Sequence, residues 1–279
     1  MRLSGKVALV TGSTKGVGAE IAVVYAQHGA YVVVTGRTAE RGKAVVEDIL
    51  ASGGKAIFVQ ADLSSEQSVR NLVDRAVAAY GRIDILVNNA ASTEMVPVVA
   101  KPVGQTSTEE FEASMKVAVY GTFWCCKYVI PRMVAAGGGS VINISSTTAT
   151  RGFPCTPGYA ASKGAVNALS RQMAADYGPH GVRVNTIVVG LVMTELGPGV
   201  ADTPEPAFDA GGRQFVPRLG ETADVAHLAV YLGSDQSSSV SAAELTVDGG
   251  ATMRGPVSPA SFDAGTRTVP GGADTFSGY

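Results

Sequence analysis

The sequence has few charged residues, few cysteines and no cluster of basic residues. Charged side chains make up 16% of the 279 residues and the formal net charge is −2, so nothing in the composition suggests a nucleic-acid partner. The three cysteines have neither the number nor the spacing of a disulfide framework or a metal site. We therefore expect no bound metal and a reducing, cytoplasmic environment, in line with the lack of a signal-peptide pattern.

Long uninterrupted hydrophobic runs are also missing. The longest apolar stretch, residues 117–136, is interrupted by Lys127 and Arg132, so it does not predict a membrane span. Hydrophobic residues nevertheless make up 46% of the chain, and the charged fraction lies below the usual value of about a quarter. This combination predicts a large buried core and favours apolar surface that is covered in an oligomer.

A glycine-rich loop near the N-terminus has the composition of a phosphate site. The apolar run 7–10 is typical of a buried parallel strand, and Gly12, Gly16 and Gly18 follow it in the pattern Gly-x-x-x-Gly-x-Gly. A helical pattern begins directly after the loop. Glycines let the backbone approach a pyrophosphate, and a helix N-terminus offers unpaired N–H groups to it.

Apolar runs alternate with helical patterns along the chain. Strands are predicted near residues 6–11, 31–36, 55–61, 83–88, 139–145, 182–188 and 243–247, and helices near 17–28, 39–52, 65–80, 108–136, 158–178 and 222–233. This alternation predicts a single-domain α/β fold of the Rossmann type, in which a doubly wound, seven-stranded parallel sheet carries helices on both faces. Ligands bind such sheets beyond the carboxyl ends of the strands, which is where the glycine loop falls.

Tyr159, Lys163 and Ser146 form a second candidate site. The tyrosine and the lysine are four residues apart in a predicted helix and therefore share one face, and Ser146 follows the fifth predicted strand. A nearby ammonium favours the phenolate and lowers the pKa of a tyrosine, which can then exchange a proton with a carbonyl or an alcohol. The constellation predicts proton chemistry on a carbonyl group.

From about Leu3 to Met253 the chain resembles the short-chain dehydrogenases/reductases. Apart from the glycine loop and the three residues above, the resemblance rests on Asp62-Leu63, Asn88-Asn89-Ala90, Asn143-Ile144-Ser145-Ser146, Arg183-Val184-Asn185 and Val247-Asp248-Gly249-Gly250. It implies an oxidoreductase in which Tyr159 is the general acid/base, Lys163 lowers its pKa and holds the nicotinamide ribose, and Ser146 binds the substrate oxygen. The implied cofactor contacts are Gly12, Ser13, Thr14, Lys15, Gly16, Val17, Gly18, Arg37, Thr38, Asp62, Leu63, Asn89, Ala90, Val119, Tyr159, Lys163, Val192 and Thr194.

The same resemblance implies a domain organisation and a substrate site. Residues 1–253 would form the cofactor-binding domain, with a substrate lid at about 195–214, and residues 254–279 a Gly/Pro-rich tail. The implied substrate contacts are Ser146, Phe153, Tyr159 and Leu196. A mostly apolar pocket favours a hydrophobic ketone or secondary alcohol. A homotetramer or homodimer is implied as well. Asn88 is open to two interpretations, a contact to the nicotinamide side or a clamp between strands.

The residues that end the second strand bear on the choice of cofactor. An acidic residue there would bind the adenosine 2′-hydroxyl of NAD and repel a phosphate, but the strand ends in Gly36-Arg37-Thr38. Lys15 in the glycine loop adds a second cation. Two cations beside the ribose favour a 2′-phosphate, so the sequence predicts NADP(H).

One residue departs from the family pattern inside the predicted catalytic set. The family usually carries an asparagine in the long helix three residues before a glycine, and Ala118 stands there, ahead of Gly121. An alanine cannot hold the water that relays protons from the lysine. The chain could turn over slowly, could relay protons through another group, or could carry a deliberate replacement. The alternative to an enzyme is an NADP(H)-binding sensor or scaffold with little turnover.

Overall fold

The fold is built on one seven-stranded sheet. A computed structural model describes residues 1–91, 101–194, 214–216 and 218–253. The strands pair in the order β3-β2-β1-β4-β5-β6-β9 and all the pairs are parallel. They span Val7–Val10 (β1), Tyr31–Gly36 (β2), Lys55–Gln60 (β3), Ile85–Asn88 (β4), Gly139–Ser146 (β5), Val182–Val189 (β6) and Glu244–Val247 (β9). The predicted doubly wound sheet is confirmed, because β4 crosses to the opposite side of β1 from β2.

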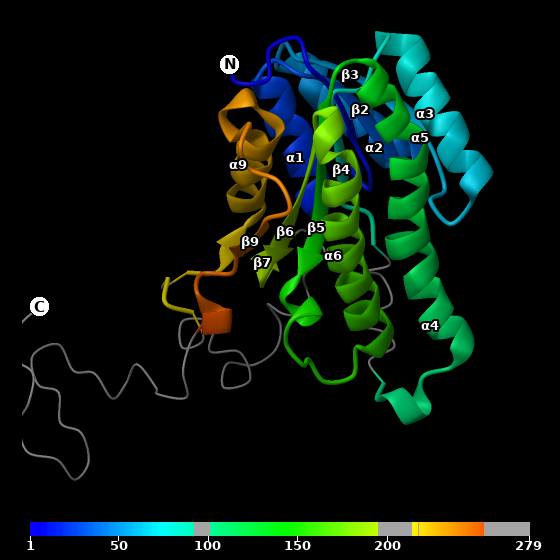
Figure 1. Ribbon diagram of the computed structural model, residues 1–279, viewed down its shortest axis with the longest axis vertical. Coiled ribbons are helices and arrows are strands. Elements are labelled where there is room, and N and C mark those ends of the chain that lie inside the picture. The colour runs from blue at the N-terminus through cyan, green and yellow to red at the C-terminus, as the bar shows by residue number, and fades with distance from the viewer. Residues whose placement is uncertain (92–100, 195–213, 217, 254–279) are drawn as a thin grey trace, which may run out of the picture.

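Helices cover both faces of this sheet (Figure 1). One face packs against α1 (Gly16–Gln27), α2 (Ala39–Ala51) and α9 (Thr222–Gly233), and the other against α3 (Glu66–Tyr80), α5 (Gly121–Ala135) and α6 (Pro157–Tyr177). Alternate residues of each central strand enter the two cores, as Ile142 and Val141 of β5 do. Strands buried on both faces have continuous apolar runs, which explains their clear signal in the sequence.

The long helix predicted at 108–136 is not continuous. It consists of α4 (Thr108–Met115), a π-helical turn at Lys116–Tyr120 and α5. Its start was predicted correctly, because Ser107 and Glu110 form a capping box, with the Ser107 hydroxyl accepting the Glu110 N–H at 3.2 Å. The π-turn contains Ala118 and was not predicted, because the hydrophobic pattern continues through it. Such turns are frequent at functional sites.

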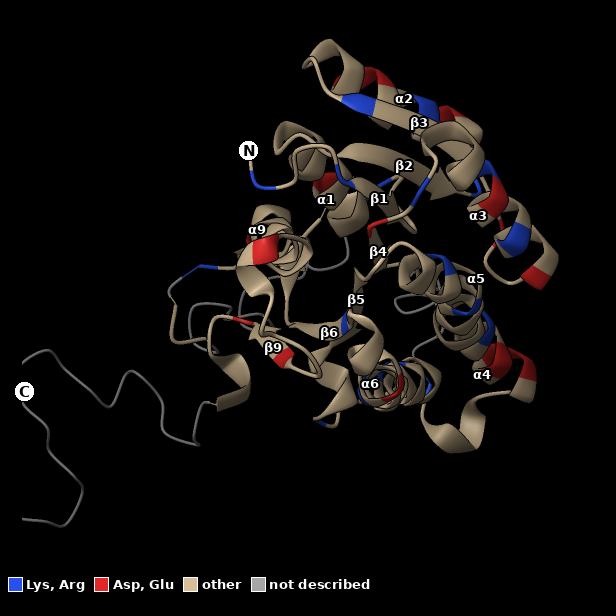
Figure 2. Ribbon diagram, turned by 45° about the horizontal axis from the view of Figure 1, so that its top comes forward, with Lys and Arg blue, Asp and Glu red and all other residues tan. Residues whose placement is uncertain are grey.

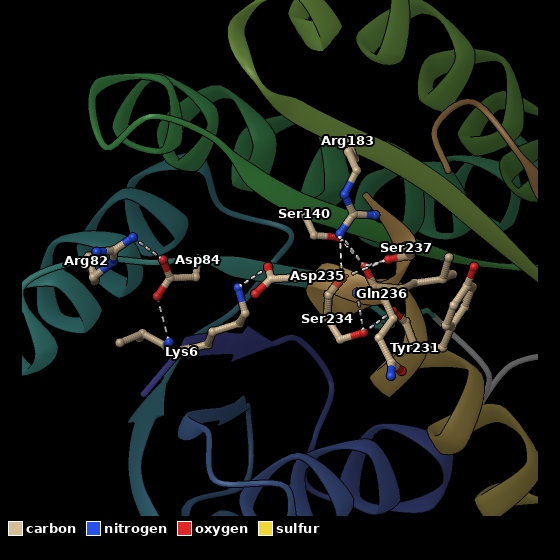
Figure 3. A network of polar contacts seen from close by, with 12 residues as sticks. Lys6, Arg82, Asp84, Ser140, Arg183, Tyr231, Ser234, Asp235, Gln236 and Ser237 are labelled. Carbon is tan, nitrogen blue, oxygen red and sulfur yellow. Dashed lines mark hydrogen bonds and ion pairs between the residues drawn. The ribbon is translucent and has the colours of Figure 1, made fainter. Parts of the chain in front are cut away.

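The amino-terminal end of the sheet holds a network of polar contacts (Figure 3). Arg183, at the start of β6, donates from Nη2 to the carbonyl oxygens of Leu232 at 2.7 Å and Ser234 at 3.3 Å. The Ser140 hydroxyl donates to the same Leu232 oxygen at 2.8 Å. These bonds fix the end of α9 to the starts of β5 and β6.

Charged side chains concentrate on α2 and α3, whereas α1 is almost free of them (Figure 2). This difference follows the packing, since α1 lies on the sheet between α2 and α9 and the Tyr25 hydroxyl donates to the Ala229 carbonyl at 2.8 Å. In the described part of the chain, no helix is long and apolar enough to cross a bilayer. The same residues contain no group of three or more His, Cys, Asp or Glu side chains placed to hold a metal ion.

Candidate functional site

A cleft of about 620 Å³ lies at the carboxyl end of the sheet. The residues that line it come from the loops and helix starts that follow β1, β2, β3, β4, β5 and β6, as expected where the strand order reverses. The predicted residues that line it are Gly12, Thr14, Lys15, Gly16, Val17, Arg37, Thr38, Asp62, Leu63, Asn89, Ala90, Ser146, Tyr159, Lys163 and Thr194. The cleft thus brings together the glycine loop and the three predicted catalytic residues.

The glycine loop is shaped so that its backbone faces the cleft. Gly12 has a φ of 62°, and a Cβ there would lie 2.9 Å from Ala90 Cα, so no larger residue fits. The loop leads into α1, whose N-cap residue, Lys15, makes no side-chain hydrogen bond to the first turn. The N–H groups of this turn are therefore left for a ligand.

Two residues of the loop do not line the cleft. The Ser13 hydroxyl is buried, donates to the Val10 carbonyl at 2.6 Å and accepts the Thr35 N–H at 2.9 Å, so it joins β1 to β2. A Cβ on Gly18 would lie 2.4 Å from both the Asn89 side chain and a loop carbonyl. Both residues hold the loop in its shape, and the cofactor contacts predicted there stay predictions.

The part of the cleft next to β2 carries the cations expected beside a ribose. Arg37 and Lys15 line it together with Arg41, which lies in the first turn of α2 and was missed in the sequence. Its position four residues after Arg37, at the start of a predicted helix, would have been a usable signal. Among all the lining residues, four are Lys or Arg and one, Asp62, is acidic.

The start of α2 in this region fits a bound anion. Its N-cap residue, Thr38, lines the cleft and makes no side-chain capping hydrogen bond. The first N–H groups of the helix are therefore open to a phosphate of a ligand. Thr35 also lines the cleft, but its hydroxyl is buried without a hydrogen-bond partner.

Ser146, Tyr159 and Lys163 meet on the other side of the cleft. Ser146 is the last residue of β5, Tyr159 lies in the first turn of α6 and Lys163 lies one turn later. Ser146 and Tyr159 are joined by a hydrogen bond, and the Ser146 Oγ also accepts the Thr148 N–H at 3.3 Å. The Lys163 ammonium is buried and donates to the Ile144 carbonyl at 2.7 Å.

The acidity of these groups differs from the sequence-based expectation. Burial raises the pKa of Tyr159, and the hydrogen bond from Ser146 opposes this only partly. We expected Lys163 to lower that pKa, but its ammonium lies 5.6 Å from the centroid of the tyrosine ring and is bound to Ile144. Burial lowers the pKa of Lys163 itself to about 8. Without a ligand, desolvation therefore dominates at both residues.

The π-turn changes which residues of the long helix face the cleft. Val117 lines it, whereas the predicted contact Val119 does not, and Ala118 is buried. Gly121 closes the turn by donating its N–H to the Lys116 carbonyl, one residue further back than in an α-helix. The helix is thus deformed at the site of the usual asparagine although that side chain is missing.

The predicted substrate side is described only in part. Phe153 is 57% exposed and does not line the cleft, and Leu196 lies outside the described residues, as do 195–213 of the predicted lid and the whole tail. Val192, a predicted cofactor contact, belongs to the short strand β7 (Val192–Met193), which pairs with β8 (Gly220–Glu221), and it does not line the cleft.

Two hydrogen bonds of the Asn88 side chain decide between its two interpretations. Its amide donates to the Asn143 Oδ1 at 2.8 Å and to the Cys126 sulfur at 3.4 Å, both of which are buried. Asn143 lies on β5, so the interpretation as a clamp between strands is the one that the structure supports.

Comparisons with known proteins give a consistent result. Residues 12–252 match a family model described as enoyl-(acyl carrier protein) reductase. The chain is 36% identical over 255 residues to the D-threitol dehydrogenase of Mycolicibacterium smegmatis, covering 91% of this chain and 95% of the relative. A solved 7α-hydroxysteroid dehydrogenase, complexed with NADH and 7-oxoglycochenodeoxycholic acid, superposes with a TM-score of 0.83 at 35% identity, covering 89% and 95% of the two chains. For a gluconate 5-dehydrogenase from Burkholderia cenocepacia, in complex with NADP and tartrate, the TM-score is 0.81 at 32% identity, covering 91% and 97%.

Proposed function

The chain belongs to the short-chain dehydrogenase/reductase family, and we propose that it is an NADP(H)-dependent oxidoreductase that interconverts a hydrophobic ketone and a secondary alcohol. The observation that carries this proposal is that Ser146, Tyr159 and Lys163 line the same cleft as the glycine loop. The relatives act on alcohol or ketone groups according to their names, which supports the reaction class.

The proposed chemistry divides between the cofactor and the protein. A bound nicotinamide would give or take the hydride. The Ser146 hydroxyl would donate a hydrogen bond to the substrate oxygen, and the Tyr159 hydroxyl would give that oxygen a proton during reduction. Because burial disfavours the phenolate that this transfer leaves, the tyrosine needs the charge of Lys163 nearby. The ammonium would have to turn from the Ile144 carbonyl toward the ribose and the tyrosine.

The reaction class can be tested with a panel of ketones and NADPH. The wild-type protein should consume NADPH with at least one hydrophobic ketone, and the rate of consumption should fall strongly in Tyr159→Phe. If NADPH bound tightly and no ketone were reduced, the oxidoreductase proposal would be wrong and the sensor alternative would stand. That alternative is not favoured by the relatives, which are dehydrogenases by name.

The preference for NADP(H) rests on residues of this chain, because the structures of relatives contain either NADH or NADP. Lys15, Arg37, Thr38 and Arg41 all line the cleft near β2. Removing one cation with Arg41→Ala should weaken NADPH binding about tenfold, since a charge-assisted hydrogen bond to a phosphate is lost, and should leave NADH binding unchanged. Lys43→Ala, on the same helix but outside the cleft, is the control. Tighter binding of NADH than of NADPH by the wild-type protein would refute the assignment.

We also propose that the proton relay behind Lys163 is impaired by Ala118. The alanine is buried in the π-turn and offers no side-chain hydrogen bond. Ala118→Asn should raise the catalytic rate while leaving NADPH affinity unchanged. An unchanged rate would show that the relay does not depend on this side chain here.

We further propose that the protein is a cytoplasmic homotetramer or homodimer. Phe111, Tyr120 and Phe123 are large apolar side chains exposed along α4, the π-turn and α5, and the charged fraction of the chain is low. Light scattering during gel filtration would test this, and a monomer at micromolar concentration would contradict it.

A further inference from the structure

Arg151 is an exposed arginine in the loop that connects two of the proposed catalytic residues. The loop begins after Ser146 at the end of β5 and leads to Tyr159 in the first turn of α6, and both of these residues line the cleft. The Arg151 N–H donates to the Thr147 carbonyl at 3.0 Å, which keeps the residue close to Ser146. Its guanidinium makes no hydrogen bond or ion pair within the described residues, so its N–H donors face solvent.

The register of the sheet shows which strand ends Arg151 lies near. Ser146, Val189 and Val247 are paired side by side on β5, β6 and β9. Neighbouring strands lie about 4.8 Å apart, so Asp248, which follows Val247, lies about 10 Å from the start of the Arg151 loop. Burial raises the pKa of Asp248, but hydrogen bonds and the charge of Arg151 outweigh it and lower that pKa below its ordinary value. The guanidinium is therefore near the carboxyl ends of these three strands.

Asp248 does not neutralise Arg151, although it lies within range of its charge. The Asp248 Oδ1 accepts the Gly250 N–H at 2.8 Å, and its Oδ2 accepts the N–H and the hydroxyl of Thr252 at 2.8 and 2.7 Å. Both carboxylate oxygens are thus engaged by Asp248's own loop. A Cβ on Gly190, which lines the cleft, would lie 2.5 Å from the Asp248 Cβ. Arg151 therefore carries an unpaired positive charge at the rim of the cleft.

Two large apolar side chains are exposed in the same region. Phe153, two residues after Arg151 in the loop, is 57% exposed, and Phe215 is 65% exposed. The Phe215 N–H donates to the Gly249 carbonyl at 2.8 Å, which places this residue next to Asp248. A surface that combines exposed apolar side chains with one unpaired cation suits a ligand with a hydrophobic body and one anionic group.

We propose that Arg151 binds a carboxylate of the substrate, while Ser146 and Tyr159 hold the carbonyl that is reduced. The substrate would be a hydrophobic oxo acid, or in the reverse direction the corresponding hydroxy acid. This inference rests on the proposed oxidoreductase function and specifies its substrate. A guanidinium forms two parallel hydrogen bonds with a carboxylate, so arginine suits this role better than lysine does. Because the contact is remote from the reacting carbonyl, it acts mainly on KM.

The test compares methyl-ketone fatty acids of increasing chain length, from levulinate upward, with their methyl esters. The two members of each pair have the same carbonyl and differ in the negative charge. With NADPH, the wild-type protein should show a kcat/KM about tenfold higher for the best acid than for its ester, as expected for a charge-assisted hydrogen bond that is partly exposed to solvent. Added salt should reduce this preference, because it screens exposed charges. Equal values for every acid and its ester would refute the proposal.

Variants of Arg151 assign the preference to this side chain. Arg151→Met should abolish it by raising KM for the acids alone, and Arg151→Lys should keep part of it, because lysine retains the charge and lacks the paired donors. The control is Arg75→Met, which should keep the wild-type preference. Arg75 is also exposed, but it lies in the second half of α3, which leads away from the carboxyl end of the sheet to the start of β4. An Arg151→Met variant that retained the preference, or that lost acid and ester activity equally, would contradict the proposal.

Two further measurements distinguish substrate binding from other roles of Arg151. Its side chain has no bond to lose within the described residues, so Arg151→Met should unfold at the wild-type temperature. A marked drop in that temperature would indicate a structural role and count against the proposal. The affinity for NADPH should also stay unchanged, and weaker NADPH binding in Arg151→Met would assign the arginine to the cofactor instead.

The outcomes also separate this inference from the proposed function. Equal reduction of acids and esters by the wild-type protein would leave the oxidoreductase proposal intact and reject the role of Arg151. If no acid or ester were reduced, the oxidoreductase proposal would lose support. Acids and esters would then be titrated into the NADPH complex by calorimetry, where tighter binding of the acids that depends on Arg151 would support its role and equal affinities would reject it.

Discussion

At the amino-terminal end of the sheet, polar side chains are paired with the protein's own backbone, whereas near the carboxyl ends of the strands several buried side-chain atoms have no hydrogen-bond partner. Arg183, Ser140 and Ser237 all donate to backbone carbonyls at the first end (Figure 3). Five buried side-chain polar atoms lack a partner in the described part of the chain. Three of them lie where strands end: Thr35 Oγ1, Asn88 Oδ1 and, just beyond β5, Thr148 Oγ1.

The helix starts divide according to whether the helix contributes to the cleft. α3 and α4 are capped by the side chains of Ser65 and Ser107, and neither helix contributes a lining residue. α1, α2 and α6 have no side-chain cap, and all three contribute lining residues to the cleft. Groups left unsatisfied cost stability, so their concentration at one end indicates where ligands bind. Substitutions at the carboxyl end of the sheet should therefore change mainly activity and cofactor binding, whereas substitutions at the amino-terminal end should change mainly the free energy of unfolding.

The largest effect is expected from Tyr159→Phe. Loss of the acid should lower kcat for ketone reduction about 10²–10⁴-fold, the usual contribution of general acid catalysis. The free energy of unfolding should change by less than about 1 kcal/mol, since only one hydrogen bond, with Ser146, is lost. Steady-state kinetics measure kcat, and urea unfolding measures the free energy of unfolding. A variant that kept wild-type activity would remove Tyr159 from the mechanism.

The opposite pattern is expected from Arg183→Met at the other end. The carbonyls of Leu232 and Ser234 would lose their charged donor and keep the hydroxyl donors Ser140 and Ser237, so the free energy of unfolding should fall by about 1–3 kcal/mol with kcat unchanged. The control is Lys127→Met, because the side chains of Lys127 and its partner Glu66 are 48% and 40% exposed, and a surface ion pair contributes about 1 kcal/mol or less. If the free energy of unfolding fell equally in Arg183→Met and in the control variant, the buried hydrogen bonds of Arg183 would contribute no more stability than a surface ion pair.

The free energy of unfolding should depend on pH because Lys163 is buried. Burial lowers the pKa of Lys163 from 10.5 to about 8, so between these values the unfolded chain holds the proton more tightly than the folded one. Raising the pH through this window therefore stabilises the fold, by about 2 kcal/mol between pH 8 and 9.5. Lys163→Met should lack this gain. Urea unfolding at both pH values, without cofactor, measures it, and parallel behaviour of the two proteins would contradict the shift.

The smallest effect is expected at the helix caps. Ser107→Ala removes a capping hydrogen bond and should lower the free energy of unfolding by about 1 kcal/mol, with NADPH affinity unchanged. Thr38→Ala, at the uncapped start of α2, should change it by less than about 0.5 kcal/mol. A comparable loss at both positions would show that α2 is capped in solution.

The parts of the site that the sequence predicted well are those that depend on local rules. The glycine loop, the strand ends and the Tyr159–Lys163 spacing follow from chain geometry, so the structure places them in one cleft as expected. Ser13 and Val119, which were predicted as cofactor contacts, do not line the cleft, for two different reasons. The side chain of Ser13 turns back to the Val10 carbonyl, and the π-turn adds a residue to the helix and so shifts the face that Val119 presents.

The alternation of strands and helices, the glycine spacing and the order of the catalytic residues determined the fold and the end of the sheet that carries the site. These features act through backbone conformation and hydrophobic pattern, which are properties of short segments. The tertiary structure alone decided which polar groups are satisfied and which are left without a partner. The difference between Ser140, paired with the Leu232 carbonyl, and Thr148, paired with nothing, depends on atoms far apart in the chain. The direction of the Tyr159 and Lys163 pKa shifts depends on burial, which only the packed molecule provides.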